Sequence, residues 1–354
     1  MTSQDLSSVQ PAGPGDPVGD EAKALPAGRA AGPWIEALRK LSRDGAAMAA
    51  AGVLLVIIAA SILAPVYAQR IAGADPFRSN LDAEVMVNGE SVPVLEPSTE
   101  GLGIGMTPIG PTWRFDAYFL GSDVQGRDVM ARLLYGGRAT LFIGGLATVI
   151  TLILAALLGI ASGFFGGWVD QILSRFLDIL WAFPIYLLAI SLSIVLLTAR
   201  FEIGPIVIES GSLVIPIVIT GIIYVPYVAR PIRGQVLALR NSDFVMAAIG
   251  LGAPAHRILL RDILPNVMTA LIVFVPLMMA LNITTETALS FLSLGVQPPQ
   301  ASWGTIIRDG QSLIYSRPWV SIAPGLAIIV TIVALNILGD GVRDAFDPRA
   351  KLRA

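Results

Sequence analysis

Few residues of this chain could do chemistry in an apolar setting, and Glu286 is the clearest of them. It lies in a long apolar stretch and follows Asn282, Thr284 and Thr285. If that stretch crosses a membrane, an ionisable side chain is expensive to bury there, so Glu286 must face a cavity or a partner. Two interpretations stay open. Either Glu286 and Asn282 line or gate a path across the membrane, or Glu286 makes an interhelical hydrogen bond or is hydrated near the outer edge.

The residue types that most enzymes and metal sites use are scarce. The chain has no cysteine and a single histidine, His256, which excludes thiolate metal sites and cysteine nucleophiles and disfavours a histidine-based metal site. The sequence contains no G-x-x-x-x-G-K-[ST] loop for nucleotide phosphates, and no H-E-x-x-H or G-x-S-x-G motif of hydrolases. We therefore predict that the chain is not an enzyme and holds no catalytic residue, cofactor or metal ion.

Composition predicts the environment of the chain. Hydrophobic residues make up 54% of the 354 residues and charged residues 14%, whereas soluble domains carry about 25% charged residues. So little of the surface suits water that we expect most of the chain to face a lipid bilayer. The formal net charge of -2 excludes a general nucleic-acid-binding role.

Six apolar stretches approach the roughly 20 residues that a helix needs to cross a bilayer. They predict an all-α integral membrane protein with spans at 46–66, 139–165, 176–197, 213–229, 268–289 and 320–338. Prolines in or near these spans are tolerable where neighbouring helices satisfy the freed backbone groups. We expect the last five spans to form one core over 139–340.

The distribution of Lys and Arg predicts the orientation, because cytoplasmic loops carry an excess of both. These residues gather just before the first span, between the fourth and fifth spans, and after the sixth. An even number of spans puts all three groups on one side. Both termini and the loop 230–267 are therefore predicted to be cytoplasmic.

The segments outside the spans differ in character. Residues 1–45 are predicted to be a largely disordered cytoplasmic tail, since residues 1–33 are poor in large apolar groups, and 341–354 a second cytoplasmic tail. Residues 67–138 are external. In them, alternating valines flank Asn88-Gly89, a strong signal for a β-hairpin in which Val85 lies opposite Val92. This hairpin either caps the protein or contacts a delivery protein.

The segment 241–266 is short, basic and amphipathic, and lies between two apolar stretches. Ser242 is a good helix N-cap, Gly252 loosens the helix that follows, and Pro254 suits the first turn of a second helix. Pro265 disfavours helical geometry in the residue before it and so predicts the end of that second helix. A basic helix of this kind either rests on lipid headgroups or docks a partner.

Within this segment, Ala247-Ala248, then Gly252, and then Leu264-Pro265 resemble the EAA loop of ABC importer permeases. Met246 occupies the position of that loop's Glu. The resemblance implies a coupling helix that enters a groove of an ATPase subunit, with 253–264 making the contact and the residues before it supporting from behind. The supporting residues are Ala247, Ala248 and Gly252. The full set assigned to coupling is Met246, Ala247, Ala248, Gly252, Ala253, Pro254, His256, Arg257, Ile258, Leu259, Arg261, Leu264 and Pro265.

Three other stretches narrow the family. Residues 120–138 are similar to the Gly-Thr-Asp-x-x-Gly-Arg-Asp entry to the second span of oligopeptide and dipeptide permeases, with Ser122 in place of Thr. Residues 290–304 and 335–348 look like the corresponding parts of their C-type subunit. Asp123, Arg127 and Asp128 form part of a charged belt at the outer membrane edge, and we favour structural ion pairs there over substrate contact.

The resemblance to this peptide/nickel/opine transporter family implies six transmembrane helices of the type I ABC importer permease fold, with the hairpin inserted between helices 1 and 2. It also implies a homologous permease subunit as heterodimer partner, two ABC ATPase subunits that hold ATP and Mg, an external substrate-binding protein, and the bacterial cytoplasmic membrane. Peptides are the implied substrate. Nickel chelates, opines or other small solutes are alternatives, and an ion-coupled secondary transporter is the alternative class.

Overall fold

The computed structural model describes residues 33–87, 90–98, 105–198, 201–203, 206–209 and 211–346. Their α-helices are α1 (Pro33–Leu41), α2 (Gly45–Ile62), α3 (Ala64–Val66), α4 (Val129–Phe165), α5 (Gly167–Ala182), α6 (Ile185–Thr198), α7 (Val214–Ile223), α8 (Val225–Arg240), α9 (Asp243–Gly250), α10 (Ala255–Arg257), α11 (Leu264–Phe291), α12 (Trp303–Asp309) and α13 (Trp319–Phe346). Two π-helical segments, η1 (Tyr67–Ala72) and η2 (Ile258–Ile263), and the 3-10 turn η3 (Gln311–Leu313) complete the helical part.

The described β-structure consists of three two-stranded antiparallel sheets. They pair β1 (Glu84–Val87) with β2 (Glu90–Pro93), β3 (Leu95–Pro97) with β4 (Met106–Pro108), and β5 (Phe201–Ile203) with β6 (Ile206–Ile208). In the first sheet Val85 pairs with Val92, which confirms the predicted hairpin register, although Asn88-Gly89 lies outside the described residues. The other two hairpins carry no comparable turn signal in the described residues.

The described residues confirm the predicted fold class. Four helices are long and apolar enough to cross a membrane: α2, α4, a continuous helix over Ala255–Phe291, and α13. Two bent pairs, α5 with α6 and α7 with α8, bring the number to six if each pair counts as one span.

One sequence expectation needs correction, and another gains detail. The third predicted span, 176–197, is not one helix, because α5 and α6 meet at 92°. Phe183 has extended backbone there, as the following Pro184 favours. The predicted tail 1–45 is also not wholly without structure. It contains α1, where the Trp34 ring packs edge-to-face on the Phe346 ring of α13, with the two ring centroids 5.3 Å apart.

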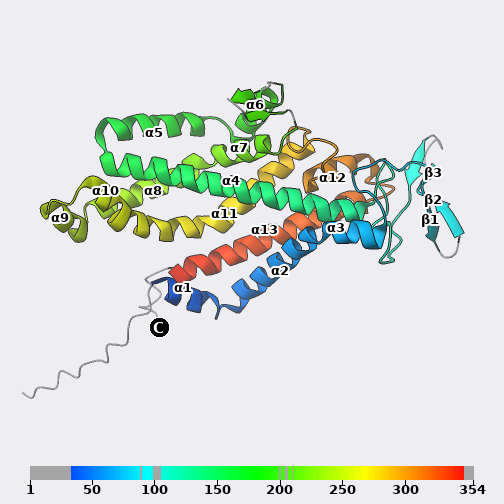
Figure 1. Cartoon of the computed structure of the whole chain (residues 1–354), viewed down its shortest axis with the longest axis horizontal. Helices are drawn as coiled ribbons and strands as arrows, with labels where there is room; N and C mark the ends of the chain where they lie inside the picture. The colour runs from blue at the N-terminus through cyan, green and yellow to red at the C-terminus, as the bar shows by residue number, and fades with distance from the viewer. Residues whose placement is uncertain are drawn as a thin grey trace, which may run out of the picture.

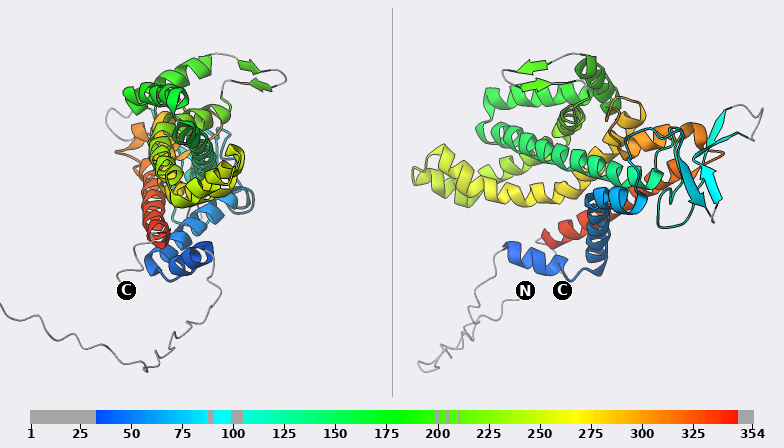
Figure 2. Two further views of the ribbon diagram at one scale, coloured as in Figure 1. Left: turned by 90° about the vertical axis from the view of Figure 1, so that its left-hand side faces the viewer. Right: turned by 45° about the vertical axis from the view of Figure 1, so that its right-hand side comes forward.

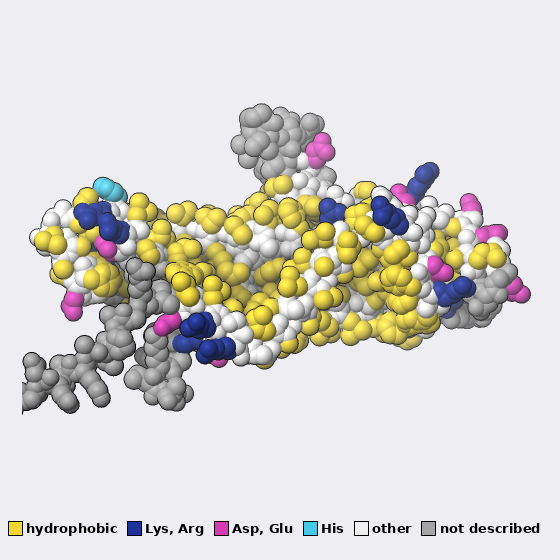
Figure 3. Space-filling model, turned by 60° about the horizontal axis from the view of Figure 1, so that its bottom comes forward, with side chains coloured by type: hydrophobic (Ala, Val, Ile, Leu, Met, Phe, Trp, Pro, Cys, Tyr) yellow, Lys and Arg dark blue, Asp and Glu magenta, His cyan; other side chains and the backbone are white. Residues whose placement is uncertain are grey.

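The helices form an elongated bundle around α4 (Figure 1). α4 packs against α8, α11 and α7, while α2 and α13 pack on each other and form a second layer below (Figures 1 and 2). The β1–β2 and β3–β4 hairpins lie at one end of the bundle, and α9 and α10 lie at the opposite end (Figure 1). On the face in Figure 3, charged side chains gather toward the two ends and hydrophobic ones cover the zone between them, as a membrane protein requires.

Glycines on one side of α4 explain why its neighbours lie so close. A Cβ added at Gly159 would stand 2.8 Å from the Ala229 carbonyl oxygen of α8, and one at Gly144 would stand 2.6 Å from Ile283 of α11. Such contacts require a hydrogen at that position, as is common between membrane helices. Gly145, on another side of α4, has nothing within 4 Å of an added Cβ.

We expect Gly159→Ala to lower the apparent melting temperature of the detergent-purified protein, because the new methyl group overpacks a backbone carbonyl at a cost of roughly 1–3 kcal/mol. Gly145→Ala is the matched control, since it meets open space and gains about 1 kcal/mol of helix propensity. Differential scanning fluorimetry of both variants checks this. Equal melting temperatures would contradict the close approach of α4 and α8.

Candidate functional site

The loop between α8 and α11, residues 241–263, is called the α8–α11 loop below. It projects beyond the other helices at one end of the bundle (Figure 1). Ser242 precedes α9 with extended backbone, as an N-cap should, but its hydroxyl donates to the Leu239 carbonyl and does not cap α9. α9 nevertheless continues the direction of the chain out of the bundle, so the loop is exposed on several sides.

Gly252 produces the break that the sequence predicts. Its φ of +77° is left-handed, and its N–H donates to the Ile249 carbonyl at 2.9 Å. The Ala253 N–H donates to the Ala248 carbonyl at 3.0 Å. These two bonds close α9 with a Schellman motif, which needs a left-handed residue and therefore favours glycine. Because an added Cβ would meet nothing within 4 Å, the requirement for glycine comes from the backbone and not from packing.

The α8–α11 loop has a buried side and an exposed side. Val245, Ile258 and Ile263 are almost fully buried in the main hydrophobic core of the chain. On the other side, Leu251 is 88% exposed and Leu260 is 65% exposed. The buried side anchors the loop, and the exposed side leaves large apolar side chains uncovered within this chain.

The predicted coupling residues divide between these two sides. The exposed ones are Met246, Ala247, Gly252, Pro254, His256, Arg257, Arg261 and Pro265, and the half-buried ones are Ala248, Ala253, Leu259 and Leu264. Ile258 is buried, so it anchors the loop and does not offer a surface. Ala247 and Gly252, which were expected to support the segment from behind, are exposed in this chain, and that role stays a prediction. Leu251 and Leu260 offer more apolar surface, although the resemblance did not single them out.

Pro265 does not end a helix, contrary to the prediction. α10, η2 and α11 form one continuous helix from Ala255 to Phe291, and Pro265 lies in the first turn of α11. A proline ring normally clashes with the carbonyl four residues earlier. The π-helical turn at Ile258–Ile263 directly precedes the proline, and such widened turns accommodate this kind of irregularity.

Glu286 and Asn282 lie fully buried on α11. One Glu286 carboxylate oxygen, Oε1, accepts a hydrogen bond from the Ser290 hydroxyl at 2.6 Å. The Asn282 amide Nδ2 donates to Thr148 Oγ1 of α4 at 3.1 Å. The Asn282 bond joins α11 to α4, whereas the Glu286 bond to Ser290 lies within α11. A role in a pathway or gate stays a prediction.

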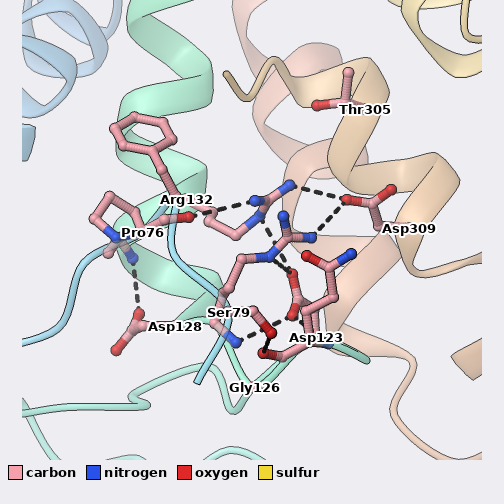
Figure 4. Close-up of polar contacts among 12 residues, drawn as sticks. Pro76, Ser79, Asp123, Gly126, Asp128, Arg132, Thr305 and Asp309 are labelled. Carbon is pink, nitrogen blue, oxygen red and sulfur yellow. Dashed lines mark hydrogen bonds and ion pairs between the residues drawn. The ribbon is translucent and has the colours of Figure 1, made fainter. Parts of the chain in front are cut away.

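The external charged belt is a buried ion-pair network and not a set of exposed pairs. Arg127 contacts Asp123 at 2.7 Å and Asp309 at 3.0 Å, and Arg132 contacts Asp309 at 2.9 Å. Figure 4 shows how Arg132 reaches from α4 to Asp309 of α12, with Asp123 close by. The network joins the loop before α4 to a helix that lies far along the sequence.

Asp128, the third member of the predicted belt, has a different role. Its carboxylate caps α4 by accepting from the Ala131 N–H at 2.8 Å, and it also accepts from the Tyr118 N–H. Burial raises the pKa of the Asp128 carboxyl, while these backbone donors act in the opposite direction. Asp128 therefore holds the start of α4 and takes no part in the ion pairs among the described residues.

Sequence reasoning missed Asp309, which bridges the two arginines. It also missed the pair of Asp170 on α5 with Arg233 on α8, whose two contacts are both 2.6 Å. Neither pairing has a local signal, since the partners are 182 and 63 positions apart. In the described part of the chain, no group of three or more His, Cys, Asp or Glu side chains could hold a metal ion.

Comparisons with known proteins identify the family of the chain. A family model described as "Binding-protein-dependent transport system inner membrane component" matches residues 155–352, and one described as "N-terminal TM domain of oligopeptide transport permease C" matches residues 32–82. The dipeptide transport system permease protein DppC of Alkalihalophilus pseudofirmus is 33% identical over 91% of this chain and 92% of its own length. The oligopeptide transport system permease protein OppC of Bacillus subtilis is 33% identical over 90% of each chain.

Among solved structures, an inward-facing MetNI methionine ABC transporter covers 61% of this chain and 97% of its own chain at 16% identity, with a TM-score of 0.49.

We expect Asp309→Asn to destabilise the protein by about 3–5 kcal/mol, because it leaves two buried guanidinium groups with the Asp123 carboxylate alone to balance their charge. Asp178→Asn is the matched control. It breaks the Arg230–Asp178 pair, whose side chains are 43% and 53% exposed, and such pairs contribute about 0–1 kcal/mol. Chemical denaturation in detergent compares the two free energies of unfolding. A loss at position 309 no larger than at 178 would contradict a structural role for the network.

Proposed function

This chain belongs to the family of binding-protein-dependent transport system inner membrane components, and from that premise we propose that it is the transmembrane permease subunit of an ATP-driven ABC importer of peptides. The single observation that carries the substrate is the similarity, at 33% identity over nine-tenths of the chain, to permeases named for dipeptides and oligopeptides. Family membership favours this over an ion-coupled secondary transporter. Nickel chelates, opines and other small solutes are the alternative cargoes within the same architecture.

The α8–α11 loop is the docking element for the ATPase subunits in this proposal. Its exposed side presents Met246, Leu251 and Leu260, and α9 and α10 of the same loop lie at one end of the helix bundle (Figure 1). Exposed apolar groups of this kind mark a protein contact. The sequence has no phosphate-binding loop of its own, so ATP and Mg would bind to the partner ATPase subunits.

The continuous helix Ala255–Phe291 supports a mechanical role for this loop. Its 37 residues extend about 55 Å, so that the docking segment and the opposite end of α11 belong to one rigid element. The N-terminal end of the loop is joined to α8, which packs along α4. A push on the loop by a closing ATPase dimer therefore moves α8 and α11 relative to the rest of the bundle.

The remaining partners and the orientation follow from the same proposal. A homologous permease subunit would complete the pathway as a heterodimer, and an external substrate-binding protein would deliver the peptide. Both termini and the α8–α11 loop would lie in the cytoplasm, as the distribution of Lys and Arg indicates. The β1–β2 and β3–β4 hairpins would then face the delivery protein's side of the membrane.

We expect Leu251→Asp to weaken retention of the ATPase subunits by at least about tenfold, because a charge replaces an exposed apolar anchor at the contact. The measurement is co-purification of the ATPases with the chain and its partner permease. A second measurement follows ATP-dependent uptake of a labelled dipeptide into proteoliposomes to which the binding protein is added. Met86→Asp, at a 60% exposed position in the β1–β2 hairpin at the opposite end of the bundle, is the matched control and should not change retention of the ATPase subunits.

Two outcomes would overturn the proposal. Undiminished retention of the ATPases by Leu251→Asp would remove the docking role of the loop. Dipeptide uptake that an ion gradient drives without ATP would remove the importer class itself.

Gly252→Ala tests the loop without changing its surface chemistry. We expect faster amide hydrogen exchange in the loop and lower peptide-stimulated ATP hydrolysis, because a left-handed residue with a Cβ costs about 1–2 kcal/mol. Gly250→Ala is the matched control. Gly250 also has open space around an added Cβ but helical backbone, so alanine there should leave the loop intact. Similar exchange rates in the two variants would contradict the need for the Schellman turn.

A further inference from the structure

A cleft of about 450 Å³ opens between α11 and α13, with Tyr227 of α8 at its side. It is called the α11–α13 cleft below. Its volume lies in the usual range for small-molecule sites. The side chains of Val273, Phe274 and Leu277 line it from α11, and Leu335 lines it from α13. This part of the cleft is apolar and lies within the spans of both helices.

Two opposite charges stand at the rim of the cleft. Asp340 and Arg343 line it from α13, and both side chains are exposed. They are three positions apart on one helix, which places their Cβ atoms about 5–6 Å apart. No ion pair joins them to each other or to another described residue. Within the described ranges, neither charge is therefore neutralised by a partner.

The position of the rim along α13 matches the level of lipid headgroups. Asp340 follows directly after the apolar stretch that ends near Leu338, on the side where α13 ends. In the proposed orientation this is the cytoplasmic leaflet. Ile329 and Val333, which are 58% and 50% exposed, lie on the same face of α13 as Asp340 by helical spacing. An acyl chain that starts at the cleft could follow this face into the bilayer.

We propose that the α11–α13 cleft binds a phospholipid with a primary amine in its headgroup, of the phosphatidylethanolamine type. Its ammonium group donates hydrogen bonds to the Asp340 carboxylate, and its phosphate accepts from the Arg343 guanidinium. Two carbons separate amine and phosphate in this headgroup, so its two charges suit two side chains one helical turn apart. The glycerol and the first acyl carbons occupy the apolar part of the cleft.

The charge pattern favours this lipid over its two closest relatives. Phosphatidylcholine carries a trimethylated amine without an N–H donor, so it cannot hydrogen-bond to Asp340. Phosphatidylglycerol carries the phosphate but no cation, so Asp340 would stand unpaired beside a negative headgroup. The site does not depend on the transported substrate, and its failure would leave the proposed function untouched.

The test titrates the assembled complex, purified with its partner subunits, with three dioleoyl lipids that differ only in headgroup: phosphatidylethanolamine, phosphatidylcholine and phosphatidylglycerol. Native mass spectrometry measures binding, and hydrogen–deuterium exchange measures lipid-dependent protection of residues 335–343. We expect phosphatidylethanolamine to bind about three- to tenfold more tightly than phosphatidylcholine, a range that allows for the exposure of the charged rim. Protection of 335–343 should follow the same order.

Variants separate the two charges. Asp340→Asn should remove the preference for phosphatidylethanolamine over phosphatidylcholine, and Arg343→Ala should weaken binding of all three lipids. Asp344→Asn, also exposed on α13 but outside the cleft, is the matched control and should change nothing. Equal binding of the three lipids to the unaltered complex would overturn the proposal, as would protection of 335–343 without lipid, which would indicate a protein partner in the cleft. Preference for phosphatidylglycerol would overturn the assignment of the amine to Asp340.

Discussion

The close approach of α4 to α8 and α11 positions every other part of the structure. At Gly159 and Gly163, backbone carbonyl oxygens of α8 lie within about 3 Å of where a Cβ would be. At Gly144, the side chain of Ile283 on α11 lies equally close to that position. In a bilayer there is little hydrophobic force between helices, so packing at this range replaces it. Because α8 and α11 carry the two ends of the α8–α11 loop, the fit along α4 also determines where that loop stands.

A continuous set of contacts runs from the α8–α11 loop to the far end of the bundle. The helix Ala255–Phe291 starts in the loop and carries Asn282, which is bound to α4 through Thr148. Near the end of α11, Ser290 binds both Glu286 and the Val296 backbone. Polar groups in an apolar interior must find such partners, so they hold α11 in one rotational setting. Beyond this point the chain turns back through α12, where Asp309 joins the ion-pair network at the entry to α4.

The sequence predicts the features that depend on local pattern. Hydropathy locates the apolar segments, although not the bends within the third and fourth of them, and the Asn-Gly signal yields the register of Val85 with Val92. The effect of proline on a helix was less predictable, because the rule used describes only the backbone of the residue before the proline. Pro184 accompanies a 92° bend, whereas Pro265 lies inside a continuous helix, shortly after the π-helical turn that this helix contains. The bridging role of Asp309 could not be read from the sequence, since its partners Arg127 and Arg132 are more than a hundred residues away.

Met246 bears on how the proposed ATPase contact is held together. The family's loop has a Glu at this position, which can pair with a cation across an interface. Here the side chain is apolar and 56% exposed, and it belongs to the same loop as the exposed Leu251 and Leu260. Apolar burial does not depend on ionic screening, whereas an exposed ion pair weakens as salt rises. In the proposed complex, the contact at this position therefore rests on shape and apolar area, and the charges of Arg257 and Arg261 are left to steer the approach of the partner.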